Sequence, residues 1–410
     1  MNRLSQRKRR TLFAFTFASV AALMIVLGAK RLAQAQDTGT RNLVYVESNI
    51  NTTGGNTVLG FSNDGRGNLT ALPGSPYPTF GTGVVAGSGN LQIDADQQVI
   101  ANPEGTLLYA VDGHSNDVAG FTINTDGSLT AIGGSPFPSG GQDPASIGYK
   151  DNAFGGGASL MVVVNKNSDP NQTGGTPNYT TFDVSSAGVM TMNPGSTFNL
   201  AAGSSPAQAL VIPGQNKFFG IEFQSQRIVT YLINKNGSLS DLSSTTPPGS
   251  SAVVLGAAID PKFKKTLYVG MPGQNQVDAF TYDAVGHVTF VNSASNPGVA
   301  VCWLVFNSAA TRLYTSDSGS GTVTVYNVSS PGLPVETQHF TLSKVNGAMA
   351  EPINLSFDTT GHFIYVLDGP NQAIHILQVA ANGTVTEPNP PFALTGLPAG
   401  TVPFGMAVVK

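Results

Sequence analysis

The chain has 410 residues, of which 40% are hydrophobic and 11% charged, and its formal net charge is −4. This composition excludes the charged, core-poor class of disordered proteins and provides enough apolar residues for a large core. The 48 glycines and 26 prolines follow no collagen period and are typical of short strands joined by tight turns. We therefore expect an all-β protein with almost no helix.

The first 35 residues have the pattern of an export signal. Four basic residues at 7–10 precede the uncharged apolar run Thr11–Ala29, and Ala33-Gln34-Ala35 offers the small residues of a cleavage site. An uncleaved anchor is the alternative, because the run of 19 residues is long enough to span a bilayer. We expect residues 1–35 to be a signal peptide or N-terminal anchor, and residues 36–410 to form one domain in the periplasm or outside the cell.

The chain beyond this segment is acidic. Residues 1–35 hold 7 of the 20 basic residues and no acidic ones, which leaves 13 basic against 24 acidic side chains, a net charge of −11. This balance argues against a nucleic-acid partner. The single cysteine, Cys302, lies in the apolar stretch VAVCWLVF and excludes an intramolecular disulfide; a buried small hydrophobic residue is the simplest interpretation.

Residues 41–410 contain seven copies of one unit. Each copy has an apolar strand, a polar loop and a second strand that ends in a turn; these opening strands begin near residues 42, 106, 159, 217, 266, 312 and 362. The repetition is clearest in GNLTALPGSPYP (Gly67–Pro78) and GSLTAIGGSPFP (Gly127–Pro138), which start 60 residues apart. A further strand precedes most copies. Four antiparallel strands in each of seven units predict a seven-bladed β-propeller.

The two ends of the repeat region predict how the ring closes. The first copy has no strand before it, whereas the final stretch PFGMAVVK, Pro403–Lys410, follows the completed seventh copy. We therefore expect this last strand to be the innermost strand of the first blade. The ligand face should then carry the loops that enter the inner strands and the loops between second and third strands, around a central funnel.

The repeated phrase of a Leu-Tyr-Val strand, a polar loop, Val-x-x-Phe, a Gly-x-Leu-Thr turn and a Ser-Pro ending resembles the seven-bladed propeller lactonase family. This family includes bacterial 6-phosphogluconolactonases and the fungal carboxymuconate lactonising enzyme. The likeness covers residues 41–410 and implies a propeller that opens lactones at its funnel. The family pattern also places Gly-Pro-Arg-His before the fourth copy, where this chain has Ser205-Pro206-Ala207-Gln208.

The resemblance implies a catalytic glutamate at Glu222, which ends the strand FGIE of the fourth copy. Lactone opening requires a group that activates water and a cation or donor that stabilises the developing oxyanion. Glu222 is the candidate base, and Arg227, five residues further on, is the candidate oxyanion partner. The alternative is a solvated ion pair of little energetic weight on the rim.

The predicted ligand-face loops are rich in amides and poor in cations. Amides both donate and accept hydrogen bonds, which suits hydroxyl-rich ligands, whereas a phosphorylated sugar acid would require several Arg or Lys residues. His114 lies between two aspartates in DGHSND and is either a metal ligand or, more simply, part of a solvated loop. The candidate ligand-binding residues are His114, Asn116, Asn165, Lys166, Gln208 and Gln224. We predict no metal and no cofactor.

Three further features have two interpretations each. Asp94-Ala95-Asp96 either lines the funnel mouth, where it would favour a cation, or forms an exposed acidic edge, which is the simpler interpretation. Trp303 either stacks on a sugar or packs between blades. The insert Asn165–Asn178 is a lid or partner contact, or a tolerated surface insertion.

Two functional hypotheses follow. The favoured one is a binding propeller of the cell envelope, which holds a lactone-like or carbohydrate-like molecule or a protein partner without turnover. It fits the replacement of Arg-His by Ala207-Gln208. The alternative is a hydrolase that opens a lactone of a sugar acid at the funnel. We expect a monomer, with membrane contact only through an uncleaved N-terminal segment.

Overall fold

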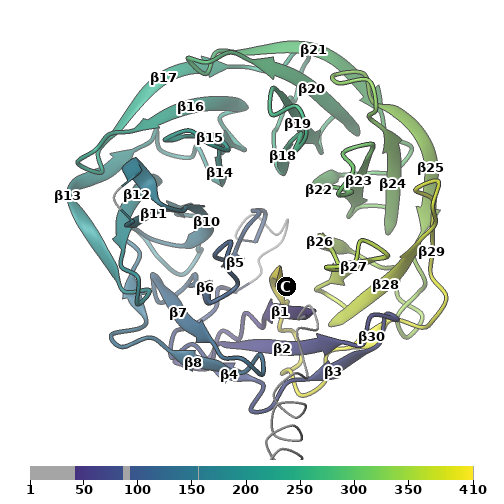
Figure 1. The fold of residues 1–410 in the computed structure, drawn as a ribbon, viewed down its shortest axis with the longest axis horizontal. Helices are drawn as coiled ribbons and strands as arrows, with labels where there is room; N and C mark the ends of the chain where they lie inside the picture. Colours follow the sequence, from purple (N-terminus) through teal and green to yellow (C-terminus); the bar gives the residue numbers. More distant parts are fainter. Residues whose placement is uncertain (1–41, 86–92, 156, 410) are drawn as a thin grey trace, which may run out of the picture. The chain divides into compact units, whose positions relative to one another are not determined.

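The computed structural model describes residues 42–85, 93–155 and 157–409, which form a ring of seven antiparallel sheets (Figure 1). The predicted signal or anchor, residues 1–35, lies outside the described residues. Within the described ranges no helix has the length and apolar character needed to cross a bilayer. The all-β, seven-bladed architecture predicted from the repeats is confirmed.

The strands of each blade are given from the axis outward. Blade 1 contains β31 (Phe404–Val409), β1 (Leu43–Glu47), β2 (Thr57–Asn63) and β3 (Leu69–Ala71), with β4 (Tyr77–Pro78) also paired to β2. Blade 2 contains β5 (Val99–Ala101), β6 (Leu107–Asp112), β7 (Asp117–Ile123) and β8 (Leu129–Ala131), with β9 (Phe137–Pro138) also paired to β7. Blade 3 contains β10 (Pro144–Lys150), β11 (Ser159–Asn165), β12 (Asn178–Val184) and β13 (Met190–Asn199), and a 3-10 turn, Ala153–Gly155, follows β10.

The remaining blades repeat this order. Blade 4 contains β14 (Pro206–Val211), β15 (Lys217–Glu222), β16 (Arg227–Ile233) and β17 (Leu239–Thr245). Blade 5 contains β18 (Ala257–Ile259), β19 (Thr266–Met271), β20 (Gln276–Tyr282) and β21 (Val288–Ser295). Blade 6 contains β22 (Val301–Phe306), β23 (Arg312–Asp317), β24 (Thr322–Asn327) and β25 (Val335–Thr341). Blade 7 contains β26 (Pro352–Phe357), β27 (Phe363–Asp368), β28 (Ala373–Val379) and β29 (Val385–Thr386), with β30 (Phe392–Ala393) also paired to β28.

The ring closes through the last strand, as the sequence predicts. β31 pairs antiparallel with β1, with Leu43 opposite Val409 and Tyr45 opposite Ala407. The first blade is therefore built from both ends of the described chain, and opening it requires breaking a complete strand pair.

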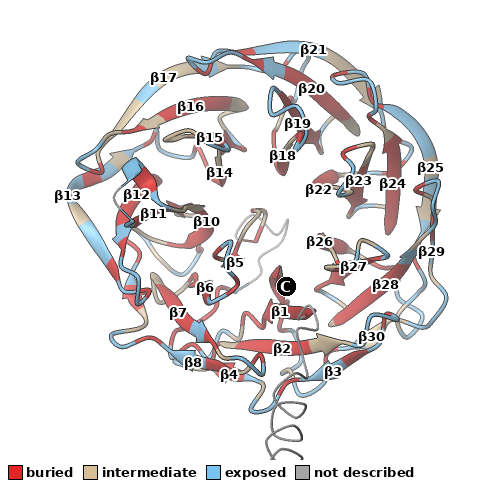
Figure 2. Cartoon of the chain, in the orientation of Figure 1, coloured by how far each residue is buried: buried red, intermediate tan, exposed pale blue. Residues whose placement is uncertain are grey.

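Burial follows the position of a strand within its blade. The second strand of blade 7, β27, is buried at every position, whereas the outermost strand of blade 6, β25, is mostly exposed. Figure 2 shows the same change from buried inner strands to an exposed outer rim around the ring. Because blades pack face to face, both faces of the middle strands are covered, which explains their nearly continuous apolar runs.

In several copies, the repeated turn that carries Gly-x-Leu-Thr or its equivalent is hydrogen-bonded to the preceding blade. The Tyr45 hydroxyl of blade 1 donates to the Gly127 carbonyl in blade 2 at 2.7 Å, and the Tyr314 hydroxyl of blade 6 donates to the Gly383 carbonyl in blade 7 at 2.8 Å. Both glycines have a positive φ, 85° and 89°, which residues with a Cβ rarely adopt. The repetition thus supplies a hydrogen bond between neighbouring blades.

The Ser-Pro ending of the repeat also makes the same contact twice. The Ser75 hydroxyl accepts a hydrogen bond from the Gly60 amide at 2.9 Å, and the Ser135 hydroxyl accepts one from the Gly120 amide at 2.9 Å. Both Ser-Pro bonds are cis. In blades 1 and 2 the outer strand is divided into two short pieces, β3 and β4 in the first and β8 and β9 in the second, which limits the exposed edge available for pairing.

Candidate functional site

A cavity of about 230 Å³ lies at the axis, on the face that carries the loops entering the inner strands. It is lined by side chains from five blades or their connections, among them Asp94, Phe223, Cys302, Trp303, Glu351 and Ile353. Asp94 and Glu351 precede inner strands and Phe223 follows a second strand, as the sequence assigned to the ligand face, whereas Cys302, Trp303 and Ile353 lie at the start of the inner strands β22 and β26. Three larger grooves, of about 330, 550 and 460 Å³, are lined by other strands and turns and by none of these loops, so the axial cavity is the better candidate.

The axis is crossed by the segment Ile93–Gln98, which leads into β5. The Asp96 amide donates to the Ala207 carbonyl of blade 4 at 3.0 Å, and the Trp303 indole of blade 6 donates to the Ala95 carbonyl at 2.7 Å. The Gln97 carbonyl accepts from the Ile147 amide of blade 3 at 2.9 Å. Figure 1 shows β5 and the coloured chain directly before it inside the ring. Three blades therefore hold this axial segment in place.

The axial segment brings a carboxyl group to the cavity. Asp94 lines it and is half-buried. Burial raises the pKa of Asp94 to about 7, while Lys166 opposes this rise and Glu351 adds to it. Burial also raises the pKa of Asp96 to about 6. The simpler interpretation of this motif as an exposed acidic edge is wrong, because both side chains are half-buried at the axis.

Two predicted ligand-binding residues, Lys166 and Gln208, hold the axial segment. The Lys166 ammonium donates to the Asp94 carbonyl at 2.7 Å, and the side chain is 1% exposed. Burial lowers the pKa of Lys166 to about 8. The Gln208 amide donates to the Gln97 side chain at 3.0 Å and to Asp96 at 3.3 Å. Both side chains therefore hold the axial segment, which carries Asp94 to the cavity. Contact of either residue with a ligand stays a prediction.

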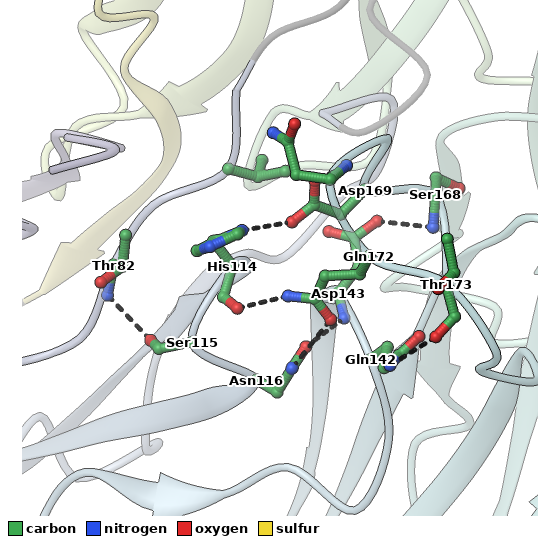
Figure 3. Close-up of polar contacts among 12 residues, drawn as sticks. Thr82, His114, Ser115, Asn116, Gln142, Asp143, Ser168, Asp169, Gln172 and Thr173 are labelled. Atoms are coloured by element: carbon green, nitrogen blue, oxygen red, sulfur yellow. Dashed lines mark hydrogen bonds and ion pairs between the residues drawn. The ribbon is translucent and has the colours of Figure 1, made fainter. Parts of the chain in front are cut away.

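His114 and Asn116 meet the insert between β11 and β12 (Figure 3). His114 Nδ1 lies 2.6 Å from Asp169 Oδ2, and the Gln172 side chain donates to the His114 carbonyl. Asn116 donates to the Gln172 side chain at 2.9 Å and accepts from the Asp143 amide at 2.8 Å. The insert is thus docked on the neighbouring blade by several polar contacts.

The other polar candidates of these loops have different surroundings. The Asn165 side chain is buried and donates to the Ser139 carbonyl at 3.1 Å and to Asn178 at 2.9 Å, which is a structural role. Gln224 is exposed. No group of three or more His, Cys, Asp or Glu side chains close enough to hold a metal occurs among the described residues.

Glu222 and Arg227 lie together, and neither lines the axial cavity, although the adjacent Phe223 does. They form an ion pair at 2.8 Å, in which Glu222 is fully buried and Arg227 is 39% exposed. The second carboxylate oxygen of Glu222 accepts a hydrogen bond from the Tyr231 hydroxyl at 2.9 Å. Buried Asp112 and Asp317 end the equivalent strands of blades 2 and 6, so a buried carboxylate at this position recurs in the ring. Catalysis by Glu222 stays a prediction.

The fold and the axial cavity define a seven-bladed propeller with one funnel-like site. Residues 180–400 match the family described as "Lactonase, 7-bladed beta-propeller", and the chain belongs to this family. Comparison with curated proteins found no match.

Solved structures with the same fold include proteins described as lactonases. A putative 6-phosphogluconolactonase from Bacteroides fragilis has a TM-score of 0.69 at 16% identity, covering 92% of this chain and 99% of that one. The periplasmic gluconolactonase of Pseudomonas aeruginosa has a TM-score of 0.70 at 13% identity, covering 91% and 99%. At these identities the similarity concerns the fold.

Proposed function

We propose that this protein binds a small, uncharged, hydroxyl-rich lactone in the axial cavity and hydrolyses it with Asp94 as the general base. The observation that carries the proposal is the position of the Asp94 carboxyl on the cavity wall, with a pKa raised to about 7 by burial. A carboxyl group with such a pKa exchanges protons readily near neutral pH, as general acid–base catalysis requires.

The cavity supports a small and uncharged ligand. Its volume of about 230 Å³ is below the range of about 300–1,000 Å³ for drug-sized ligands, so a molecule with one ring is the appropriate size. Phe223 and Ile353 provide apolar surface, whereas Asp94 and Glu351 provide hydrogen-bond acceptors. The described lining contains carboxyl groups and no Arg, Lys or His, which disfavours a phosphate ester.

In the proposed reaction, Asp94 acts first as a general base and then as a general acid. The ionised carboxylate removes a proton from a water molecule, and the resulting hydroxide attacks the carbonyl carbon of the lactone. The ring C–O bond then breaks, and the protonated Asp94 returns the proton to the departing alkoxide oxygen. Lys166 is a cation that contacts the cavity residues Asp94 and Phe223, and its charge favours the negative charge that develops on the substrate.

We further infer that the protein acts outside the cytoplasm. The basic start, apolar run and small-residue cleavage pattern of residues 1–35 support export. A gluconolactonase of the same fold from Pseudomonas aeruginosa is described as periplasmic. An unphosphorylated lactone is a substrate that fits such a location.

The test compares the purified protein with Asp94→Asn and Glu222→Gln on a panel of unphosphorylated aldonolactones. We expect turnover above the spontaneous rate that falls by about 10²–10⁴-fold in Asp94→Asn and persists in Glu222→Gln. Quenching of Trp303, the only tryptophan, measures binding separately. Binding without turnover in the unmodified protein would make it a binding propeller, and loss of turnover in Glu222→Gln alone would identify Glu222 as the base.

A further inference from the structure

Lys166 is a buried cation at a place where a polar loop residue would normally be solvated. It follows directly after the end of β11 and begins the insert, yet its side chain is 1% exposed and reaches the axis. Burying an ammonium group is costly unless opposite charge and hydrogen bonds compensate. The single hydrogen bond to the Asp94 carbonyl, at 2.7 Å, does not balance a full charge, so nearby carboxylates must contribute.

Two carboxyl groups flank Lys166 from different elements. Asp94 belongs to the axial segment, and Asp143 immediately precedes β10; each interacts with the Lys166 charge. Asp143 Oδ2 accepts the Ser168 amide at 2.9 Å, whereas its other carboxylate oxygen is buried without a hydrogen-bond partner. The positive charge of Lys166 favours the ionised form of both carboxyl groups. Protonation of any one of these three groups therefore affects the other two.

Other charges surround this trio. Glu351 acts on Asp94 across the cavity, and Asp169 acts on Asp143 from the insert. Asp169 is itself paired with His114, which is 41% exposed. These neighbours are mainly acidic. Among the described residues at the axis, Lys166 is the only buried cation, so it alone counteracts their negative charge. Its removal therefore leaves Asp94 among like charges.

Building on the proposed function, we infer that Lys166 is a positioning residue that favours the ionised form of the Asp94 carboxyl group and fixes the main chain of Asp94 at the cavity wall. The ammonium holds the Asp94 main chain by one hydrogen bond and provides the charge that favours the carboxylate. The insert that starts at Lys166 is docked through the His114–Asp169 pair (Figure 3), so the anchoring of this loop on blade 2 also fixes the cation at the axis.

The test separates charge from hydrogen bonding with Lys166→Gln, which keeps a donor, and Lys166→Arg, which keeps the charge. We expect the acidic limb of the kcat/KM profile to move to higher pH by about one unit or more in Lys166→Gln and to remain near its original position in Lys166→Arg. An identical profile in Lys166→Gln and the unmodified protein would overturn the inference.

A second readout does not depend on turnover. Trp303 donates to the Ala95 carbonyl, next to Asp94, so its fluorescence reports the ionisation of the axial segment. We expect a pH transition that is lost in Asp94→Asn and shifted upward in Lys166→Gln, with circular dichroism confirming that each variant is folded. If no lactone is hydrolysed but this shift occurs, the role of Lys166 stands while the proposed reaction fails; an unshifted transition overturns the role.

Discussion

Removing the last eight residues, Pro403–Lys410, deletes β31 and leaves blade 1 without its innermost strand. Phe404, Met406 and Val409 are 1%, 7% and 3% exposed in the intact ring. Burial of each such side chain contributes about 1.5–3 kcal/mol, so the deletion removes at least about 5 kcal/mol before any backbone hydrogen bond is counted. Domains of ordinary stability unfold with about 5–15 kcal/mol. We expect the truncated protein to be largely unfolded or to melt far below the intact protein.

The measurement is the unfolding midpoint in urea and on heating, followed by circular dichroism. Phe404→Ala is the graded control, because truncating one buried aromatic side chain costs about 3–5 kcal/mol and should give an intermediate midpoint. A synthetic peptide of residues 403–410 should restore stability to the truncated chain in a concentration-dependent way. A melting curve unchanged by the deletion would refute closure by β31.

Two further predictions concern contacts away from the axis. Tyr314→Phe removes the hydroxyl that bonds blade 6 to a turn of blade 7 and should lower the unfolding free energy in urea by about 1–2 kcal/mol, whereas Tyr365→Phe, whose hydroxyl has no partner in the described structure, should cost less. Burial alone would lower the pKa of His375, but its bonds to Asp368 and Glu387 raise it above the ordinary value. The stability from charged His375 is therefore present below pH 6.5 and lost as pH rises through the raised pKa; His375→Gln should abolish this part of the decline in melting midpoints above neutral pH.

The fold was predictable because the same pattern occurs seven times. In five of the described copies the turn glycine accepts a hydrogen bond from a hydroxyl of the preceding blade, as in the pairs Tyr45–Gly127 and Tyr314–Gly383. The first copy lacks an inner strand and the end of the chain has one extra strand, β31. Pairing β31 with the first copy was the arrangement that completed both. Local turn chemistry and long-range closure therefore agreed, which is what allows a sequence to specify one architecture.

The site was harder to predict because polar loops look alike in sequence. Lys166 and Gln208 were identified as ligand-face residues, but nothing in their neighbours along the chain showed that both contact the axial segment. One signal was present: 20 residues separate β4 from β5, whereas 5 separate β9 from β10. A long connection inside a compact domain frequently has a function of its own, and this one carries Asp94 to the cavity.

The departure from the family pattern at Ala207-Gln208 has a physical counterpart in the axial segment. Ala207 is fully buried and accepts the Asp96 amide through its carbonyl, and Gln208 bonds the side chain of Gln97. The buried Gln208 side chain also bonds Asp96 and Ala257, so a histidine at position 208 would have to replace these contacts with the axial segment and blade 5. The chain thus keeps the propeller of its family while placing a carboxyl group from blade 2 at the axis. This is why the loss of Arg-His does not by itself argue against chemistry at the funnel.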